Sequence, residues 1–385
     1  MPRLLWLFSF VNLVIGSGAF VISGILGPIS SALGISVPAA GQAISAYALS
    51  TAVLAPLALV ATGRWSRRNA MVLALVLFTL GCAVSAASTD LATLLAGRVL
   101  MGVGAMFTPI AAGIALALVA PARYGQALSL VFLGISLAYV VGVPLGAWLG
   151  LTYGWHVPLW AATALSALTT LLLAALVPRD IRAPGASFAG LCTLLARRDV
   201  LSVLVMTLLY FTAIFSVFSY SGPVLQALVP MSAERLSVTL ALFGLSGVAG
   251  TLLGGEANDR YGARRTLLVQ LAVLGLTMAL LPLTRGSYGA MLCVLLAWGT
   301  AGFGMMAPQQ SRLAALAPAQ APLLLSLNTS MLYFGTALGA AAGGTASVAL
   351  GLHRLGWVGV PFVAAALAIL VAGRTLAKQG APQTP

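Results

Sequence analysis

The sequence predicts an all-α membrane protein in which twelve transmembrane helices form two pseudo-symmetric six-helix bundles. Hydrophobic residues make up 61% of the 385 residues and charged residues only 6%, a composition that no soluble domain can hydrate. The mean hydropathy is +1.06. Long apolar runs recur along the whole chain, and its two halves resemble each other in sequence. A duplicated helical bundle embedded in a bilayer accounts for these observations.

Twelve apolar runs mark the spans, because a helix of about 20 apolar residues crosses the hydrocarbon core. The spans are expected at roughly 4–33, 39–62, 70–88, 91–119, 127–150, 157–177, 200–221, 236–254, 266–283, 289–311, 322–349 and 355–373. The first run begins directly after Arg3 and is too long for the core of a signal peptide, so we expect it to be retained. In the fifth span, Gly142, Pro144 and Gly146 predict a bend at the proline and close packing along the glycine face.

The basic residues predict the orientation. Fifteen of the 19 Lys and Arg residues fall in loops on the side of the N-terminus, and three fall in loops on the other side. Since basic loops stay in the cytoplasm, we expect both termini to be cytoplasmic. The net charge of +13 then reflects topology and contact with lipid head groups, and nucleic acid is not an expected partner.

The longest polar stretch, Val177 to Asp199, divides the chain into an N-terminal bundle (1–177), a cytoplasmic linker (178–199) and a C-terminal bundle (200–385). Within it we expect an interfacial amphipathic helix from Ser187 to Arg198. The two bundles repeat: at a shift of 200, Gly102, Gly104 and Met106 match Gly302, Gly304 and Met306, and at a shift of 197, Ser129, Leu130, Gly142 and Gly146 match Ser326, Leu327, Gly339 and Gly343. Duplicated halves of this kind place a substrate site at their interface near the bilayer midplane.

Arg98 is the one charge inside the fourth span, about seven residues or roughly 10 Å from its start. An ionisable group at that depth costs several kcal/mol unless it faces a partner, the bundle interior or a water-filled cavity. Arg98, Gly102 and Met106 share one helix face, which we expect to face the cavity. The alternative is a structural arginine satisfied by backbone carbonyls.

Neutral polar side chains supply the other candidates for substrate contact. They are Asn12, Ser17, Gln42, Ser45, Tyr47, Tyr139, Tyr210, Ser216, Gln309, Gln310, Asn328, Thr329 and Tyr333. Such hydrogen-bonding groups among aromatic and Met side chains suit a neutral or mildly amphipathic organic solute. Each of them could equally serve as an interhelical hydrogen bond.

Two basic loops with glycines occupy equivalent places in the halves. The loop after the eighth span reads GGEANDRYGARR, from Gly254 to Arg265, and the loop after the second reads GRWSRR, from Gly63 to Arg68. Glycine lets such a loop approach a neighbouring helix, Asp259 can accept hydrogen bonds from an arginine or a helix N-terminus, and the arginines can hold phosphates or carboxylates. Positive-inside anchoring is the alternative for both loops.

With the twelve spans and the repeat, these loops resemble the G-x-x-x-D-R-x-G-R-R signature of the major facilitator superfamily, whose loops lock the cytoplasmic ends of the two halves. The resemblance implies gating roles for Gly255, Asp259, Arg260, Gly262, Arg264 and Arg265 in the C-terminal copy, and for Arg64, Arg67 and Arg68 in the N-terminal copy. The N-terminal copy departs from the signature, with Gly63 in place of the acid and Ser66 in place of the glycine.

Further motifs resemble one branch of this superfamily. Arg98, Gly102 and Gly104 resemble the R-x-x-x-G-x-G motif of proton-coupled members, and Gly134 with Gly142, Pro144 and Gly146 resembles the fifth-span antiporter motif of exporters. The stretches around Gln310-Ser311-Arg312 and Leu327 to Ser330 resemble the arabinose-efflux-permease branch of the twelve-span drug:proton antiporters. The resemblance implies a monomer in a bacterial inner membrane that exports a drug, sugar, nucleoside or similar metabolite by alternating access in exchange for protons, with no cofactor.

Proton coupling is where the sequence departs from such relatives. The six acids, Asp90, Asp180, Asp199, Glu234, Glu256 and Asp259, all map to loops or helix ends, so no carboxylate is expected in mid-membrane. Three mechanisms remain: a proton carried by a loop-edge group such as Asp259 or His156, ion competition at Arg98, or facilitated diffusion by a uniporter. Our hypothesis is that no intramembrane carboxylate mediates coupling.

Other classes of protein fit the sequence poorly. The two histidines, His156 and His353, fall in outer loops without an acid or cysteine nearby in sequence, so neither a catalytic set nor a metal site is expected. No phosphate-binding loop is present, which argues against ATP-driven transport. The two-fold repeat and the gating signature disfavour a passive channel.

Overall fold

The structure, a computed structural model, describes residues 3–120, 123–178, 194, 196–317 and 320–379. Every regular element in this part of the chain is a helix. Twelve of its helical segments are long and apolar enough to cross a membrane. The predicted all-α fold with twelve spans is confirmed.

The N-terminal half contains α1 (Arg3–Phe20), α2 (Ile22–Leu33), α3 (Val37–Ala61), α4 (Arg67–Ala86), α5 (Leu91–Gly104), α6 (Phe107–Ala117), α7 (Tyr124–Leu137), the π-helical turn η2 (Ala138–Gly142), α8 (Val143–Tyr153) and α9 (His156–Leu176). The C-terminal half contains α11 (Arg198–Phe218), α12 (Ser221–Leu228), α13 (Ala233–Tyr261), α14 (Ala263–Leu280), η3 (Leu281–Thr284), α15 (Tyr288–Gly304), α16 (Met306–Leu316), α17 (Ala321–Leu350), η5 (Leu352–Arg354) and α18 (Gly356–Gln379).

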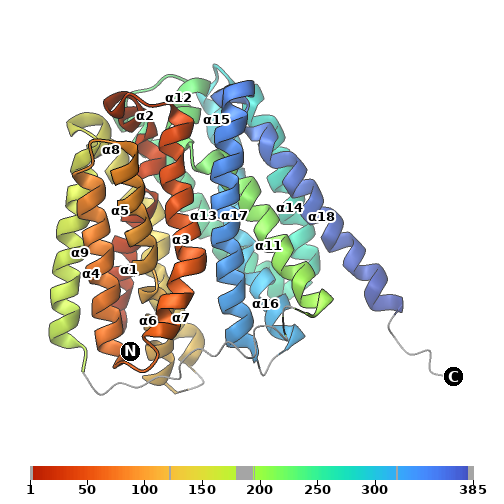
Figure 1. The fold of residues 1–385 in the computed structure, drawn as a ribbon. Helices are drawn as coiled ribbons and strands as arrows, with labels where there is room; N and C mark the ends of the chain where they lie inside the picture. The colour runs from red at the N-terminus through yellow and green to blue at the C-terminus, as the bar shows by residue number, and fades with distance from the viewer. Residues whose placement is uncertain (1–2, 121–122, 179–193, 195, 318–319, 380–385) are drawn as a thin grey trace.

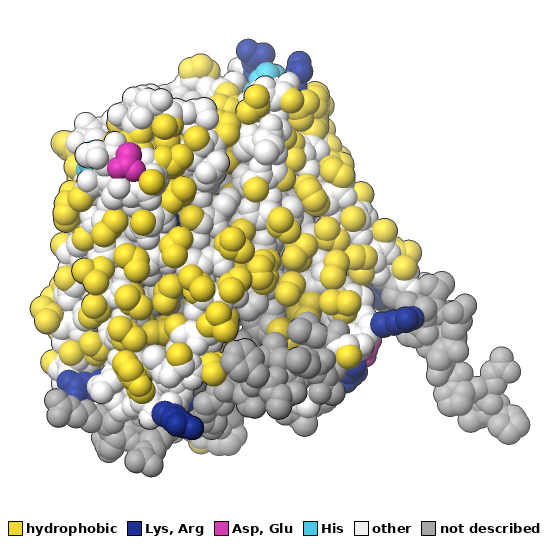
Figure 2. All heavy atoms as spheres, viewed as in Figure 1, with side chains coloured by type: hydrophobic (Ala, Val, Ile, Leu, Met, Phe, Trp, Pro, Cys, Tyr) yellow, Lys and Arg dark blue, Asp and Glu magenta, His cyan; other side chains and the backbone are white. Residues whose placement is uncertain are grey.

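Figure 1 shows the two halves side by side, with α3 and α17 adjacent where they meet. The start of α1 and the end of α18 lie at the same end of the molecule, which we call the terminal end; the opposite end is the far end. Hydrophobic side chains cover the middle of the face shown in Figure 2, and Lys and Arg side chains gather at its two ends. This distribution is that of a protein surrounded by hydrocarbon.

In four of the interrupted spans, a proline explains the interruption. A proline lacks the N–H group of a helix, and its ring clashes with the carbonyl four residues earlier. The pairs of clashing carbonyl and proline are Ala105 with Pro109, Val140 with Pro144, Ser219 with Pro223, and Gly304 with Pro308. They fall at the α5–α6 break, in η2, at the α11–α12 break and at the α15–α16 break. The bend expected at Pro144 is thus a π-helical turn.

The first span, expected as one run over 4–33, is also two helices, α1 and α2, with a break at Val21. No proline stands four residues after Val21. This break therefore needs another cause, and the contacts of Arg98 described below supply one. Because the seventh span breaks between α11 and α12, the interruption recurs at equivalent places in the two halves.

The junction of the eighth and ninth spans differs from the expected loop over Gly254 to Arg265. Helix α13 continues to Tyr261, and α14 begins at Ala263. Only Gly262 lies between them, with φ of +79°, a conformation that favours glycine. The arginine signature thus occupies two helix ends joined by one residue.

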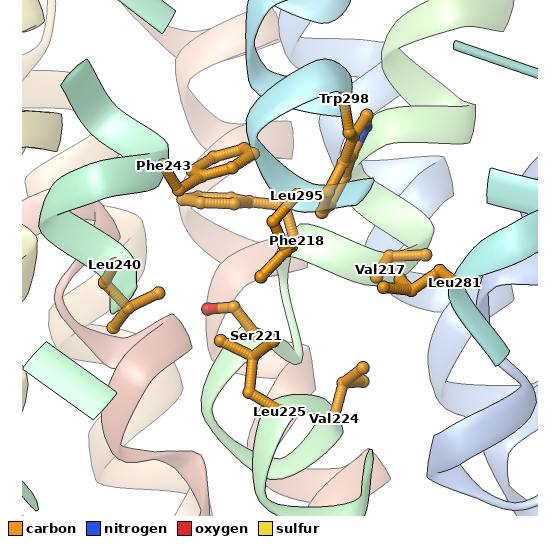
Figure 3. Close-up of a pocket in the computed structure, with 10 residues that line it drawn as sticks. All are labelled: Val217, Phe218, Ser221, Val224, Leu225, Leu240, Phe243, Leu281, Leu295 and Trp298. Atoms are coloured by element: carbon orange, nitrogen blue, oxygen red, sulfur yellow. The ribbon is translucent and has the colours of Figure 1, made fainter. Parts of the chain in front are cut away.

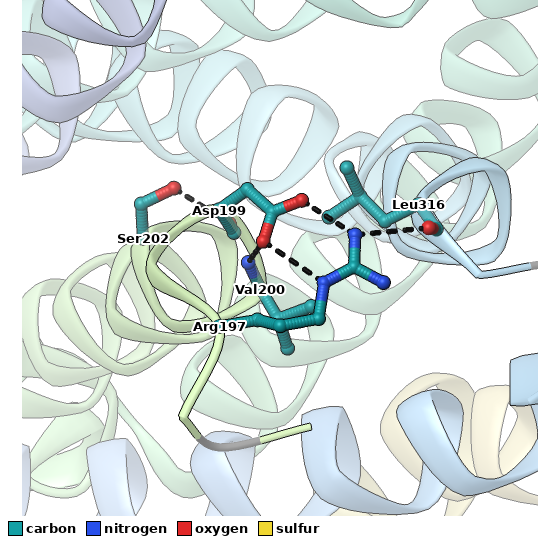
Figure 4. A network of polar contacts seen from close by, with 5 residues as sticks. All are labelled: Arg197, Asp199, Val200, Ser202 and Leu316. Carbon is teal, nitrogen blue, oxygen red and sulfur yellow. Dashed lines mark hydrogen bonds and ion pairs between the residues drawn. The ribbon is translucent and has the colours of Figure 1, made fainter. Parts of the chain in front are cut away.

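The linker expected at 178–199, with its interfacial helix from Ser187 to Arg198, falls mostly outside the described residues. Where the chain is described again, Arg197 binds Asp199 through Nη2 at 2.6 Å and donates to the Leu316 carbonyl at 3.2 Å (Figure 4). The hydrogen bond and the charge of Asp199 raise the pKa of Arg197. These contacts join the start of α11 to the end of α16.

Glycine governs how closely α13 packs on α15. A methyl group at Gly250 would collide with the backbone of Thr300, and one at Gly254 would collide with the backbone of Gly304. Gly255, the next residue, faces open space. The close approach expected from the signature glycine Gly255 is therefore made by Gly254.

This contrast makes Gly254 and Gly255 a matched pair of mutation sites. We expect Gly254→Ala to lower the free energy of unfolding by about 1–3 kcal/mol through overpacking. Gly255→Ala should leave it unchanged or raise it by up to about 1 kcal/mol, because alanine favours a helix over glycine. Titration of the purified protein with SDS measures both changes, and equal effects of the two substitutions would contradict the packing described here.

Candidate functional site

The two halves meet through short polar contacts and small residues. Ser45 Oγ donates to the Ala337 carbonyl at 3.3 Å, Ser221 Oγ to that of Ser23 at 3.3 Å, and Ser237 Oγ to that of Pro144 at 2.8 Å. All three bonds cross from one half to the other, in the middle of the molecule or toward its far end. The far end is also where α2 packs on α12.

A cluster of aromatic rings lies at the same interface, near the middle of the helices. We define this aromatic cluster as Phe20, Tyr47, Tyr139, Phe215, Phe218, Phe303 and Tyr333. Four ring contacts in it join the halves: Phe20 with Phe215 at 5.8 Å, Tyr47 with Tyr333 at 6.2 Å, Tyr139 with Phe218 at 5.7 Å, and Tyr139 with Phe303 at 5.0 Å between centroids. Edge-to-face and offset rings at these separations attract one another.

The structure thus brings together Tyr47, Tyr139 and Tyr333 from the predicted set. The four phenylalanines of the cluster are not in the predicted set, which consists mainly of polar side chains. Their signal was present: Phe211, Phe215 and Phe218 follow helical spacing in the seventh span, so they share one helix face. The rings of Phe215 and Phe218 contact each other and rings of the N-terminal half.

Arg98 lies directly behind this cluster and is fully buried. Its Nε donates to the Ala43 carbonyl at 3.2 Å, Nη1 donates to that of Gly18 at 2.9 Å, and Nη2 donates to that of Ala19. Gly18 and Ala19 belong to the last turn of α1, whose carbonyls have no partner within their helix. Arg98 therefore caps α1 where the first span breaks, and it ties α5 to α1 and α3.

The guanidinium also contacts the aromatic cluster. Its carbon lies 5.0 Å from the centroid of the Tyr47 ring, which in turn meets Tyr333 of the other half. No described carboxylate lies within ion-pair distance of Arg98, since the two ion pairs of the described residues are Arg197–Asp199 and Arg260–Glu256. The positive charge is balanced by carbonyl dipoles and a ring face.

Two polar networks lie closer to the terminal end, one in each half. Asn12 donates to the Val131 carbonyl at 2.9 Å and accepts from Thr108 at 2.7 Å, joining α1, α6 and α7. The equivalent helices α11, α16 and α17 are joined by Gln309, whose Nε2 donates to Thr207 Oγ1 at 2.8 Å, and by Thr207, which donates to Asn328 at 2.6 Å. Asn12, Gln309 and Asn328 therefore bond between helices of one half.

The remaining substrate candidates lie in varied surroundings. Ser17 bonds to its own helix at the Leu13 carbonyl, and Tyr210 donates to Met306 sulfur at 3.4 Å. Met106 is buried in the core of the N-terminal half. Gln42 and Gln310 are exposed. Of these five, Tyr210 reaches the aromatic cluster through Phe211, whose ring contacts those of Tyr210 at 4.7 Å and Phe215 at 6.0 Å between centroids.

The gating candidates of the two basic loops make contacts inside their own halves, whereas the gating candidate Pro144 accepts the bond from Ser237 of the other half. Arg67 donates to the Gly63 carbonyl at 3.5 Å, and Arg68 donates to that of Ala174. Arg260 pairs with Glu256 at 2.6 Å, and Arg264 donates to the Leu370 carbonyl at 3.4 Å. Asp259 accepts from Asn258 at 3.2 Å, and Arg64 is exposed. Among these contacts of the basic loops, none locks one half to the other.

The described acids all lie at the ends of the molecule. Asp90 and Glu234 are exposed at the far end, and Asp199, Glu256 and Asp259 are exposed at the terminal end; Asp180 lies outside the described residues. Asp90 accepts the Thr93 N–H at 2.9 Å as the cap of α5, which lowers its pKa. In the part of the chain that the structure covers, no carboxylate occupies the membrane interior, and no group of His, Cys, Asp or Glu could hold a metal.

A small cavity of about 10 Å³ lies beside the break between α11 and α12. Figure 3 shows its lining, in which Ser221 and Trp298 are the residues with polar atoms among apolar side chains. A volume of this size holds about one water molecule. It is too small for an organic solute, so it is not the substrate site in this conformation.

Comparison with known proteins gives consistent results. The family model described as Major Facilitator Superfamily matches residues 8–340. The chain is similar to the inner membrane transport protein YdhP of Escherichia coli (strain K12), with 33% identity over 374 residues that cover 96% of this chain and 94% of that one. It is also similar to an uncharacterized MFS-type transporter, YbcL, of Bacillus subtilis (strain 168), with 28% identity that covers 92% and 91% of the two chains.

Solved structures share the fold. A bacterial homolog of the human lysosomal transporter Spinster, crystallised in an inward-facing and unoccupied conformation, superposes with a TM-score of 0.81 and 16% sequence identity. The match covers 99% of this chain and 98% of that one.

The contacts of Arg98 predict the effect of replacing it. Arg98→Ala leaves the buried carbonyls of Gly18 and Ala19 without a donor, so we expect the free energy of unfolding to fall by about 3 kcal/mol or more and transport to be lost. Arg98→Lys should be impaired less, because an ammonium keeps the charge but reaches fewer carbonyls. SDS titration and transport in liposomes measure the two effects.

The matched control is Arg235→Ala, since Arg235 also stacks on a ring, that of Tyr288 at 4.0 Å, but lies at the far end. This variant should keep the stability and transport of the parent. An Arg98→Ala protein with parental stability and transport would show that the capping of α1 is unimportant.

Proposed function

The chain belongs to the Major Facilitator Superfamily, and we propose that it exports a small, neutral or mildly amphipathic organic solute across a bacterial inner membrane by alternating access. Members of this superfamily are membrane transporters of small solutes and not enzymes. The inner-membrane location is supported by the relative YdhP, whose name gives it that location. A drug, sugar, nucleoside or similar metabolite has the chemistry that we propose for the cargo.

The observation that carries this proposal is the aromatic cluster at the interface of the halves. Its seven rings come from both halves and carry no charge, and three of them add a hydroxyl group. Rings and hydroxyls of this kind hold an organic solute by stacking and a few hydrogen bonds. A solute bound between the halves contacts both, as alternating access requires.

The contacts between the halves support a direction of opening for this conformation. The hydrogen bonds of Ser45, Ser221 and Ser237 tie the halves together in the middle and toward the far end. If the terminal end is cytoplasmic, as the basic residues predict, the path to the outside is closed. We therefore assign this structure to the side of the transport cycle in which solute is loaded from the cytoplasm.

Coupling is the second part of the proposal. We propose exchange for protons without an intramembrane carboxylate, because the five described acids are all exposed at the ends of the helices. The same observation favours the alternative function, a uniporter that moves solute down its gradient. The two differ in whether a pH gradient can drive solute uphill. We also propose that the protein works as a monomer and needs no cofactor.

Labelling with an impermeant thiol reagent tests the orientation. In a variant without native cysteines, Ser232→Cys at the exposed start of α13 should react in intact cells. Trp65→Cys, 51% exposed at the terminal end, should react only after the cells are opened. The reverse pattern would overturn the orientation and the direction of transport.

Transport by purified protein tests the function and its coupling. Growth of an overexpressing strain across a panel of toxic compounds first identifies a cargo. In liposomes, saturable counterflow of that cargo should occur, which an open pore or an enzyme does not give. A pH gradient should then drive uphill movement, and this should survive neutralisation of Asp90, Asp199, Glu234, Glu256 and Asp259 one at a time.

Counterflow without any uphill movement would favour the uniporter. If neutralising one of these acids abolished uphill movement but left counterflow intact, that carboxylate would be required for coupling. The proposal that coupling does not need it would then be wrong.

A further inference from the structure

A second site lies on the outside of the C-terminal half, away from the interface. It is a groove of about 740 Å³ between the terminal-end part of α13, the start of α14 and the middle of α15. It shares no residue with the aromatic cluster. A volume of several hundred Å³ is in the range that binds an organic ligand. Leu253 and Val269, 55% and 63% exposed, lie on its rim, so the groove opens toward the surrounding lipid.

The length and depth of this groove match one leaflet of a bilayer. On α14 it extends from Arg265 to Val273, and on α13 from Tyr261 to Gly250. At the rise of an α-helix these stretches are roughly 12 Å and 17 Å long. Half of a hydrocarbon core is about 15 Å thick. An acyl chain of the leaflet at the terminal end therefore fits along the groove.

The charge at the mouth of the groove selects the head group. Three arginines surround the junction of α13 and α14, and two of them are already engaged: Arg260 with Glu256, and Arg264 with the Leu370 carbonyl. Arg265 lines the groove, is exposed, and has neither a hydrogen bond nor an ion pair with any described residue. A guanidinium placed there can bind a phosphate through two parallel hydrogen bonds. Tyr261, also on the rim, is a residue type typical of the bilayer interface.

Gln270 supplies an independent sign of a missing ligand. It lines the groove about 7 Å deeper than Arg265, and its Oε1 is buried without a hydrogen-bond partner. An unpaired buried polar atom is unfavourable unless a ligand satisfies it. A carboxamide can turn either its oxygen or its NH₂ group to a ligand. At this depth it meets the glycerol region of a lipid whose phosphate is on Arg265.

We propose that this groove binds one anionic phospholipid from the leaflet at the terminal end. Arg265 holds the phosphate, Gln270 binds the glycerol region, and an acyl chain lies between α13, α14 and α15. The lipid would support the junction at Gly262, where α13 and α14 are joined by a single residue.

Native mass spectrometry of the delipidated full-length protein tests this site. Added phosphatidylglycerol should give one tightly bound lipid per chain, and phosphatidylcholine should bind more weakly. Arg265→Gln should weaken phosphatidylglycerol binding about fivefold, the effect of one basic residue on an anionic lipid. Phosphatidylcholine binding should weaken less, because the choline ammonium offsets the charge of its phosphate. Ala297→Phe, which fills the groove from α15, should abolish the tight binding of both lipids.

Arg3→Gln is the matched control, because it removes an exposed arginine from the same end of the molecule but far from the groove in the chain. It should bind lipid like the parent. Parental binding of phosphatidylglycerol by Arg265→Gln would overturn the proposal. A parent dimer that Ala297→Phe converts to a monomer would also overturn it, since a second copy would then fill the groove. Should Ala297→Phe fail to fold, Arg265→Gln and Gln270→Leu decide the question.

Discussion

The need to satisfy every backbone polar group inside a bilayer governs this structure. Water cannot replace a lost hydrogen bond there, so each interruption of a span needs an internal partner. At the break in the first span, Arg98 supplies that partner by donating to the carbonyls of Gly18 and Ala19. The cost of burying a guanidinium is thus offset by the broken helix that it caps. Without such a cap, the first span could not turn at the interface of the halves, where the substrate site is proposed.

Much of the fold could be predicted from composition, because apolar length alone decides whether a helix crosses a bilayer. The breaks were only partly open to prediction: a proline marks four of them, including those before Pro109 and Pro308, but Pro56 and Pro361 lie inside helices that continue past them. The end of α13 was misjudged because polar residues suggested a loop. Arginine and glutamate favour helix at an aqueous end, and only Gly262 forces a turn.

The site was less accessible to sequence reasoning, for a physical reason. Asn12, Gln309 and Asn328 are polar residues in apolar helices, and polarity alone does not tell whether a side chain faces a solute or a neighbouring helix. That difference depends on which helices touch, which is a property of the packed halves. The rings of Phe20 and Phe215 are in contact although 195 positions separate them in the sequence, and no local sequence pattern predicts this contact.

Among the described residues, no ion pair joins the two halves, and this affects how the protein responds to salt. The contacts across the interface are serine hydroxyls on carbonyls and rings on rings, whereas the two ion pairs lie within the C-terminal half. Dissolved salt screens charges but barely changes such neutral contacts. The proposed balance between closed and open forms should therefore be nearly independent of ionic strength.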